Sequence, residues 1–191
     1  LGVRDKNVEY MMNDSATVLA FVQEGDLWSY SPGNGKVNQV FSFRKTEDGD
    51  FRDSRIQHDI KIVRVTDAGD IDFVLYGYMN RGSHEGYEGI GVYHYNPDKN
   101  VAEERAFIPV SESFEFLKKD LEKLSYVNEE NELFLLLAKS LYKINIEDNS
   151  SEVLEEGIKN ANFVSSDNND HAAWLVSEGD EKGNIKEINF D

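Results

Sequence analysis

The chain has 191 residues with 37 acidic and 20 basic side chains, giving a formal net charge of −17, and it contains no cysteine. This charge disfavours nucleic acid and anionic membrane surfaces as partners, and the missing cysteines exclude disulfides, thiolate nucleophiles and zinc sites of the cysteine type. An aromatic content of 12% argues against a disordered acidic tail, and the apolar runs are too short for insertion into a membrane.

Short apolar runs bounded by Gly, Asn and Asp dominate the chain and predict β-strands. In chain order these runs are 17–22, 60–65, 71–79, 91–95, 132–138, 140–146, 172–177 and 184–190. One segment, 114–124, predicts a helix, because Phe114, Leu117, Leu121 and Leu124 recur at helical spacing after Ser113 as N-cap. The sequence therefore predicts an all-β protein with one short helix.

The strands form a weak repeat. Each copy has an apolar strand, a strand of the form apolar-aromatic-x-apolar (LWSY, VYHY or LYKI) and a further strand after a polar turn. A fourth copy stops before its last strand. Further strand candidates precede the copies, which gives four strands per unit of roughly 45 residues, as in β-propeller blades. The predicted blades are 8–43, 58–110, 123–158 and 160–191.

The cadence of LWSY, VYHY and LYKI resembles the third strands of bacterial β-propellers of the TolB-like or quinoprotein-like kind, over most of residues 8–191. The resemblance implies antiparallel four-stranded blades of a small or partial β-propeller, about four in number, with one inserted helix. The chain has no WD dipeptide and no kelch double glycine, so no subfamily is assigned. The alternative fold is an open antiparallel meander or sandwich with one docked helix.

The start of the chain and its composition add two expectations. Because the sequence begins with Leu1 and shows no signal peptide, we expect residues 1–191 to be a single propeller-like domain excised from a longer chain, whose remainder is a partner. Cysteine-free acidic chains are common outside the cytoplasm of Gram-positive bacteria. We therefore expect an extracytoplasmic or cell-surface location in a bacterium, with the cytoplasm as the alternative.

Motifs for well-known chemistries are missing from the sequence. It has no GxSxG, HExxH or GxxxxGK[ST] string, and EGYEGIG at 85–91 reverses the dinucleotide spacing, which indicates a flexible connection between strands. The four histidines show no local metal-ligand spacing. Acidic stretches at 47–53, 67–72 and 166–170 could be drawn around calcium, but ordinary turn chemistry explains them. We expect no catalytic residue, no metal and no cofactor.

Three insertions interrupt the predicted blades, at 44–57, 79–90 and 111–124. In a four-stranded blade, the connection between the second and third strands leaves on the same side as the link to the next blade, so all three insertions should share one face. Four of the seven arginines lie in the first two insertions, and Arg is favoured at recognition surfaces. The alternative is that these arginines neutralise their acidic neighbours. The predicted partner-binding residues are Arg52, Arg55, Arg81, His84 and Tyr87.

We expect a non-catalytic binding or scaffolding module whose partner is a protein or a glycan. The first alternative is the propeller portion of a hydrolase, a peptidase or glycoside-active enzyme that uses clustered carboxylates. The second is a structural piece of a longer chain with no ligand of its own. The fold class does not decide among them, because propellers serve both binding and catalysis.

Overall fold

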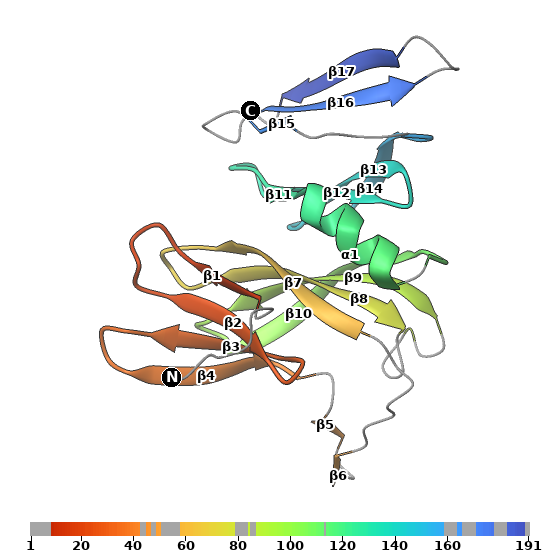
Figure 1. Cartoon of the computed structure of the whole chain (residues 1–191). Helices are drawn as coiled ribbons and strands as arrows, with labels where there is room; N and C mark the ends of the chain where they lie inside the picture. Colours follow the sequence, from red (N-terminus) through yellow and green to blue (C-terminus); the bar gives the residue numbers. More distant parts are fainter. Residues whose placement is uncertain are drawn as a thin grey trace. The chain divides into compact units, whose positions relative to one another are not determined.

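The computed structural model describes residues 9–42, 45–46, 49–50, 58–78, 84, 87–112, 114–158, 164–165, 171–177 and 183–189. The chain divides into two compact units, Leu1–Phe114 and Glu115–Asp191. Strands make up more than a third of the chain, and the one helix of the described part is α1, Phe114–Lys123 (Figure 1). The predicted all-β class with one short helix is confirmed. No helix in the described residues has the length and hydropathy needed to cross a membrane.

The first unit holds two four-stranded antiparallel sheets and a short two-stranded one. The strands of the first sheet, in the order β1-β2-β3-β4, are β1 (Tyr10–Met12), β2 (Leu19–Gln23), β3 (Asp26–Ser31) and β4 (Lys36–Phe41). The second sheet, in the order β10-β9-β8-β7, contains β7 (His58–Val65), β8 (Ile71–Tyr78), β9 (Glu88–Asn96) and β10 (Val101–Pro109). Between them lies the small hairpin of β5 (Lys45–Thr46) and β6 (Gly49–Asp50).

The second unit holds most of α1, a four-stranded sheet and a three-stranded sheet. The third sheet consists of β11 (Ser125–Val127), β12 (Glu132–Leu137), β13 (Ser140–Asn145) and β14 (Ser151–Glu155). The fourth consists of β15 (Val164–Ser165), β16 (His171–Ser177) and β17 (Gly183–Asn189). These sheets lie within the ranges predicted for blades. Their membership of a single domain within a longer chain stays a prediction, and the predicted N-cap Ser113 lies outside the described residues.

The three four-stranded sheets share an irregularity at the same place. In each, the fourth strand holds one extra residue, a β-bulge, opposite the apolar-aromatic dipeptide of the third strand. Because the bulge falls at the same point, the dipeptides Leu-Trp, Val-Tyr and Leu-Tyr occupy equivalent positions in their sheets. The extra residues are Val40, Arg105 and Leu154.

Strand alternation gives each of these sheets two apolar faces. On one face, which we call the aliphatic face, two aliphatic residues pair across the second and third strands next to the bulge. On the opposite face, the aromatic face, the neighbouring pair contains an aromatic ring. The aliphatic pairs, all buried, are Val22–Leu27, Val74–Val92 and Leu136–Leu141; the aromatic pairs are Phe21–Trp28, Phe73–Tyr93 and Leu135–Tyr142.

The first unit is held together by packing the aliphatic face of the first sheet against the aromatic face of the second. β1 and β2 contact β7, while β4 contacts β10, and the two sheets lie face to face in Figure 1. Phe41 of β4 reaches both Phe73 and Tyr93, with ring centroids 5.2 and 4.9 Å away. Burying a large apolar side chain contributes roughly 1.5–3 kcal/mol. This core therefore supplies much of the driving force for folding the unit.

The burial of the strands corrects one part of the expected core. Phe73, Leu75, Leu133 and Leu135 are buried, as the apolar alternation predicts. Leu19 and Phe21 are only half-buried, whereas Ala20 and Val22 beside them are buried. The reason is that Leu19 and Phe21 lie on the aromatic face of the first sheet, which the second sheet does not cover. The expected core positions 173 and 175 lie outside the residues whose burial is described.

A polar latch joins the first two sheets at their short turns. Asp67 lies in the turn between β7 and β8, and Asn13 and Ser15 lie in the turn between β1 and β2. The carboxylate of Asp67 accepts hydrogen bonds from Asn13 Nδ2 at 2.5 Å and from Ser15 Oγ at 2.6 Å. The Asn13 side chain also accepts from the backbone N–H groups of Thr17 and Val18. The hydrogen bond from the Ser15 hydroxyl lowers the pKa of Asp67 below its usual 3.8. The hydrogen bond from the Asn13 amide acts in the same direction to a smaller extent.

Truncation of Leu135 to Ala tests the packing of the third sheet. Because Leu135 is fully buried, we expect the free energy of unfolding in urea to fall by roughly 2–5 kcal/mol. Phe116→Ala in α1 is the control, since that ring is 62% exposed and its loss should change stability by less than about 0.5 kcal/mol. Equal effects of the two substitutions would contradict the assigned register.

Substitution of Asp67 by Ala tests the latch through its pH dependence. A carboxyl with a lowered folded-state pKa stabilises the fold above the unfolded pKa of 3.8, and this stabilisation is lost as pH falls through the folded value. We expect wild type to be more stable than Asp67→Ala by a constant amount above about pH 5, and the difference to shrink as the pH falls below the unfolded pKa of 3.8. Thermal unfolding across this range measures it. A difference that grows on acidification would rule out the latch.

Candidate functional site

The long connections of the second sheet leave from one of its ends. Backbone pairing aligns His58, Gly77, Gly89 and Pro109 in a single row across its four strands. The insertions 44–57, 79–90 and 111–124 therefore begin or end beside this row, which we call the insertion end. Residues 88–90, expected in a connection, already belong to β9. The opposite end carries the short turns between β7 and β8 and between β9 and β10.

Two of the five predicted binding residues can be placed. His84 and Tyr87 lie in the connection between β8 and β9, and the backbone N–H of Tyr87 donates to the carbonyl of His84 at 3.1 Å. Arg52, Arg55 and Arg81 lie outside the described residues. The placement of an arginine-bearing surface beside His84 and Tyr87 therefore stays a prediction.

His84 is fixed to the second sheet by a hydrogen bond and a ring contact. Its Nε2 lies 2.7 Å from Oε1 of Glu104, and its ring stacks on Phe107 with centroids 3.8 Å apart and planes 8° apart. The other carboxylate oxygen of Glu104 accepts from the hydroxyl of Tyr93 at 2.9 Å. Burial raises the pKa of Tyr93, and the hydrogen bond to Glu104 raises it further by a smaller amount. The Tyr93 hydroxyl therefore remains protonated and acts as a donor. These four residues, the His84 cluster, hold the middle of a long connection in place.

Two glycines of the 85–91 motif make room for this cluster. A Cβ atom on Gly91 would lie 2.7 Å from Cε2 of Tyr93, and one on Gly89 would lie 2.5 Å from the carbonyl oxygen of Ile108 and 2.8 Å from Cζ of Phe107. Both glycines are in β9, so interpreting 85–91 as a flexible connection is wrong for these residues. Their lack of side chains lets the rings of Phe107 and Tyr93 lie close to the strand.

Tyr87 presents an aromatic ring to solvent next to the His84 cluster. Its side chain is 61% exposed, in contrast to Tyr95 near the other end of β9, which is buried. Exposed aromatic rings on short, anchored segments are favoured contact residues, because they offer a large surface at a small cost in conformational entropy. The arrangement is suited to stacking against a planar or sugar-like group.

A second polar cluster is buried within the second sheet. The carboxylate of Asp72 is enclosed, with Oδ2 2.7 Å from Nε of Arg64 and Oδ1 2.8 Å from Nδ1 of His94. Nε2 of His94 lies 3.7 Å from Asp70 Oδ1, so both ring nitrogens face carboxylates. Arg64, Asp72 and His94 lie on β7, β8 and β9, respectively. This cluster compensates a buried charge and ties three strands together, and it leaves neither oxygen of Asp72 available as a base.

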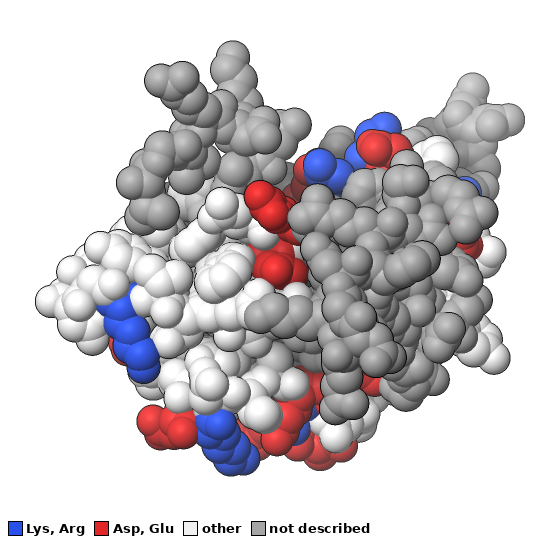
Figure 2. Space-filling model, turned by 90° about the horizontal axis from the view of Figure 1, so that it is seen from below, with Lys and Arg blue, Asp and Glu red and all other residues white. Residues whose placement is uncertain are grey.

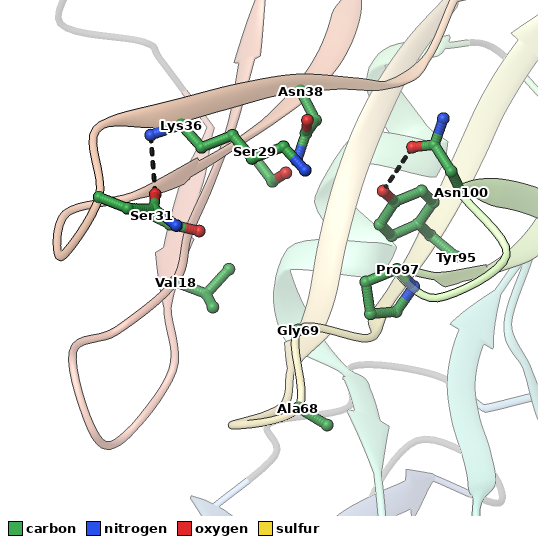
Figure 3. A pocket seen from close by; sticks show the side chains of 11 residues that line it. Val18, Ser29, Ser31, Lys36, Asn38, Ala68, Gly69, Tyr95, Pro97 and Asn100 are labelled. Atoms are coloured by element: carbon green, nitrogen blue, oxygen red, sulfur yellow. Dashed lines mark hydrogen bonds between the residues drawn. The ribbon is translucent and has the colours of Figure 1, made fainter.

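A cavity of about 470 Å³ lies between the first and second sheets, at the short turns (Figure 3). Among the described residues that line the cavity, Lys36 is charged and none carries a carboxylate. Tyr95, whose pKa is raised by burial, donates its hydroxyl to Asn100 at 3.0 Å. The lining residues of this turn-end cavity are Val18, Ser29, Ser31, Asn34, Lys36, Asn38, Ala68, Gly69, Tyr95, Pro97 and Asn100.

Sequence reasoning missed the turn-end cavity, although one pattern indicates it. Ser29 and Asn38 pair across β3 and β4 on the aliphatic face of the first sheet. Ala20 of β2 is the partner of Ser29 in the same cross-strand row. Polar residues at inward positions of an otherwise apolar face require hydrogen-bond partners, so they indicate a place that a polar group can occupy. The cavity can accept a small polar molecule through hydroxyl and amide groups, with one positive charge from Lys36.

On the face that Figure 2 shows, the described charged residues are unevenly distributed. Figure 2 shows a broad area of uncharged residues that only a few Lys, Arg, Asp and Glu side chains interrupt. Among the described residues, no group of three or more His, Asp or Glu side chains is arranged to hold a metal ion.

Comparisons with known proteins find similarity in structure but not in sequence families. No family model and no curated protein matches the sequence. The tricorn protease is similar in structure, with a TM-score of 0.50 and 16% identity, over 94% of this chain and 15% of that one. Dipeptidyl peptidase 4 of Porphyromonas gingivalis has a TM-score of 0.47 and 11% identity, over 95% of this chain and 28% of that one. Oligogalacturonate lyase of Vibrio parahaemolyticus has a TM-score of 0.48 and 13% identity, over 83% of this chain and 42% of that one.

The likeness to the tricorn protease and the antiparallel four-stranded sheets together show that the fold of this chain is propeller-like. Its four-stranded antiparallel sheets are the blades. The chain spans less than half the length of each of these three proteins, and 15% of the tricorn protease. At such low identity the likeness concerns the fold alone, and the subfamily is not assigned.

Substitution of Gly89 by Ala tests the close approach at the insertion end. The added methyl group would meet the backbone oxygen of Ile108, which cannot rotate away, so we expect a loss of roughly 1–3 kcal/mol in unfolding free energy. Gly33→Ala is the matched control, because a Cβ atom there meets nothing within 4 Å. Chemical denaturation of both variants measures the difference. If Gly89→Ala leaves the free energy of unfolding unchanged, β9 and β10 are not packed as described.

Proposed function

We propose that this chain is a non-catalytic β-propeller-type module for binding or scaffolding, and that its recognition surface is the insertion end. The observation that carries the proposal is the anchoring of His84. Nε2 of its ring is held by Glu104, and one ring face rests on Phe107, while Tyr87 three residues later is 61% exposed. A connection that is fixed to a rigid sheet and presents a free ring is typical of a recognition loop.

The proposed ligand is a carboxylate-bearing glycan or a protein segment that carries acidic or aromatic groups. Tyr87 supplies a stacking surface. In this proposal Arg52, Arg55 and Arg81 supply planar guanidinium groups that bind carboxylates in a bidentate manner. Because the whole chain is strongly acidic, such a ligand must be short enough to contact the insertion end without facing the rest of the surface.

The hydrolase alternative requires carboxylates that converge with room for a substrate. The most buried carboxylate described, that of Asp72, has both oxygens engaged by Arg64 and His94. Asp72 therefore does not supply the free carboxylate that this alternative needs, and the anchored loop favours the binding module.

We also propose an extracytoplasmic or cell-surface location, on the basis of the acidic, cysteine-free composition. Detection of the protein by protease shaving of intact cells tests this location.

Binding is tested with two hexasaccharides of similar size. A hyaluronan hexasaccharide carries glucuronate carboxylates, whereas chitohexaose is neutral. We expect calorimetry to show tighter binding of the hyaluronan fragment, and Tyr87→Ala to weaken it at least about fivefold, the equivalent of about 1 kcal/mol.

Lys36→Ala is the control variant, because it removes the charge of the turn-end cavity at the other end of the second sheet. It should leave binding unchanged. Loss of binding in Lys36→Ala with normal binding in Tyr87→Ala would transfer the site to the turn-end cavity. Absence of binding to both sugars and to an acidic peptide library would refute the proposal.

A further inference from the structure

The turn-end cavity lies between two sheets of the same compact unit, apart from the insertion end. Its volume of about 470 Å³ falls within the range of small-molecule sites, roughly 300–1,000 Å³. Figure 3 shows Ser29 and Asn38 of the first sheet facing Tyr95 and Asn100 of the second across this space. The apolar core and the polar latch hold the two sheets together, so the two walls of the cavity are fixed.

Hydrogen-bond donors without a protein partner line this cavity. Ser29 is only 6% exposed, and its hydroxyl makes no hydrogen bond within the described part of the chain. The side-chain oxygen of Asn34 accepts from the backbone N–H of Lys36 at 2.9 Å, and that of Asn100 accepts from the hydroxyl of Tyr95 at 3.0 Å. Each of these two amides therefore has its NH₂ group left to donate to a ligand.

The charge of the lining selects the sign of a ligand. Lys36 brings one positive charge, and its ammonium forms no ion pair with any described residue. An ammonium surrounded by free donors favours an anion and disfavours a cation. A single positive charge balances a single negative one, and the net charge of −17 opposes a ligand that carries two.

Part of the lining is apolar and suits the C–H surface of a ligand. Val18 and Pro97 approach each other beside Gly69, where an added Cβ atom would lie 4.0 Å from Val18 Cγ2 and 3.5 Å from Pro97 Cγ. Apolar walls combined with a few converging polar groups are typical of small-molecule sites. A fitting ligand therefore combines one carboxylate, several hydroxyl groups and a short carbon chain.

We propose that the turn-end cavity binds a small hydroxy acid that carries a single carboxylate. Lys36 and the amide of Asn34 hold the carboxylate, while Ser29 and Asn38 meet the hydroxyl groups. This site is separate from the recognition surface proposed above, because the two lie at opposite ends of the second sheet. Failure of the hyaluronan test at the insertion end would therefore leave this site unaffected.

Three probes with the same carbon skeleton test the ligand chemistry. Gluconate has one carboxylate, sorbitol has none and glucarate has two. We expect calorimetry to show that gluconate binds at least about tenfold more tightly than either of the others, because the cavity supplies one charge for one carboxylate. Equal binding of gluconate and sorbitol, or no binding of gluconate at millimolar concentration, would overturn the proposal.

Two lysine variants test whether gluconate binds in the cavity. Lys36→Ala should weaken gluconate binding at least about fivefold. Lys99→Ala is the matched control, because Lys99 is also exposed and lies in the turn between β9 and β10 but does not line the cavity. It should bind gluconate as wild type does. Equal losses in the two variants would indicate general attraction to a positive charge and would overturn the cavity site.

Ser29→Ala separates ligand binding from stability. Because the hydroxyl of Ser29 has no partner among the described residues, its removal should not lower the free energy of unfolding in urea. We expect the same variant to bind gluconate at least about threefold more weakly, since the ligand loses a hydrogen bond. Unchanged gluconate binding in Ser29→Ala would contradict the proposed site.

Discussion

The face-to-face packing of the first and second sheets is the contact on which the other described features of the first unit depend. Phe41 crosses from the first sheet to Phe73 and Tyr93, whose rings stack 5.3 Å apart in the second. In this packing the Tyr93 ring is partly buried, and its hydroxyl donates to Glu104. Glu104 in turn holds His84. The position of a surface loop is thus set by an apolar contact between two sheets.

The same packing shows how a sheet with two apolar faces is used within the first unit. Each four-stranded sheet is apolar on both faces, so a single sheet leaves one face in water whichever side is covered. The bulge in each fourth strand increases the local twist and places the aliphatic and aromatic pairs at equivalent points. One kind of contact can therefore be repeated from sheet to sheet.

The two ends of the second sheet differ in chemistry. At the short turns, side-chain amides and hydroxyls satisfy the backbone and join the sheets, as the Asn13–Asp67 latch does, and a polar cavity remains between them. At the insertion end, long connections leave the sheet, and rings packed over glycines hold the connection that carries His84. Long connections on a rigid sheet can vary without disturbing the core, which makes this end suited to recognition.

Much of this architecture can be predicted from the sequence, because alternation of apolar residues and the placement of Gly, Asn and Asp are local properties. The strands, the single helix and the four-strand units follow from them.

Which face of β2 is buried could not be predicted, since Leu19, Ala20, Phe21 and Val22 are all apolar and only the neighbouring sheet selects Ala20 and Val22. The roles of Gly89 and Gly91 likewise depend on rings from β9 and β10 that come close only in the folded sheet. His84 was recognisable as a loop residue, but its partners Glu104 and Phe107 lie about 20 residues away and are brought to it by strand pairing. Local pattern thus determined the elements, while packing between sheets decided which side chains are buried, which are held and which remain open.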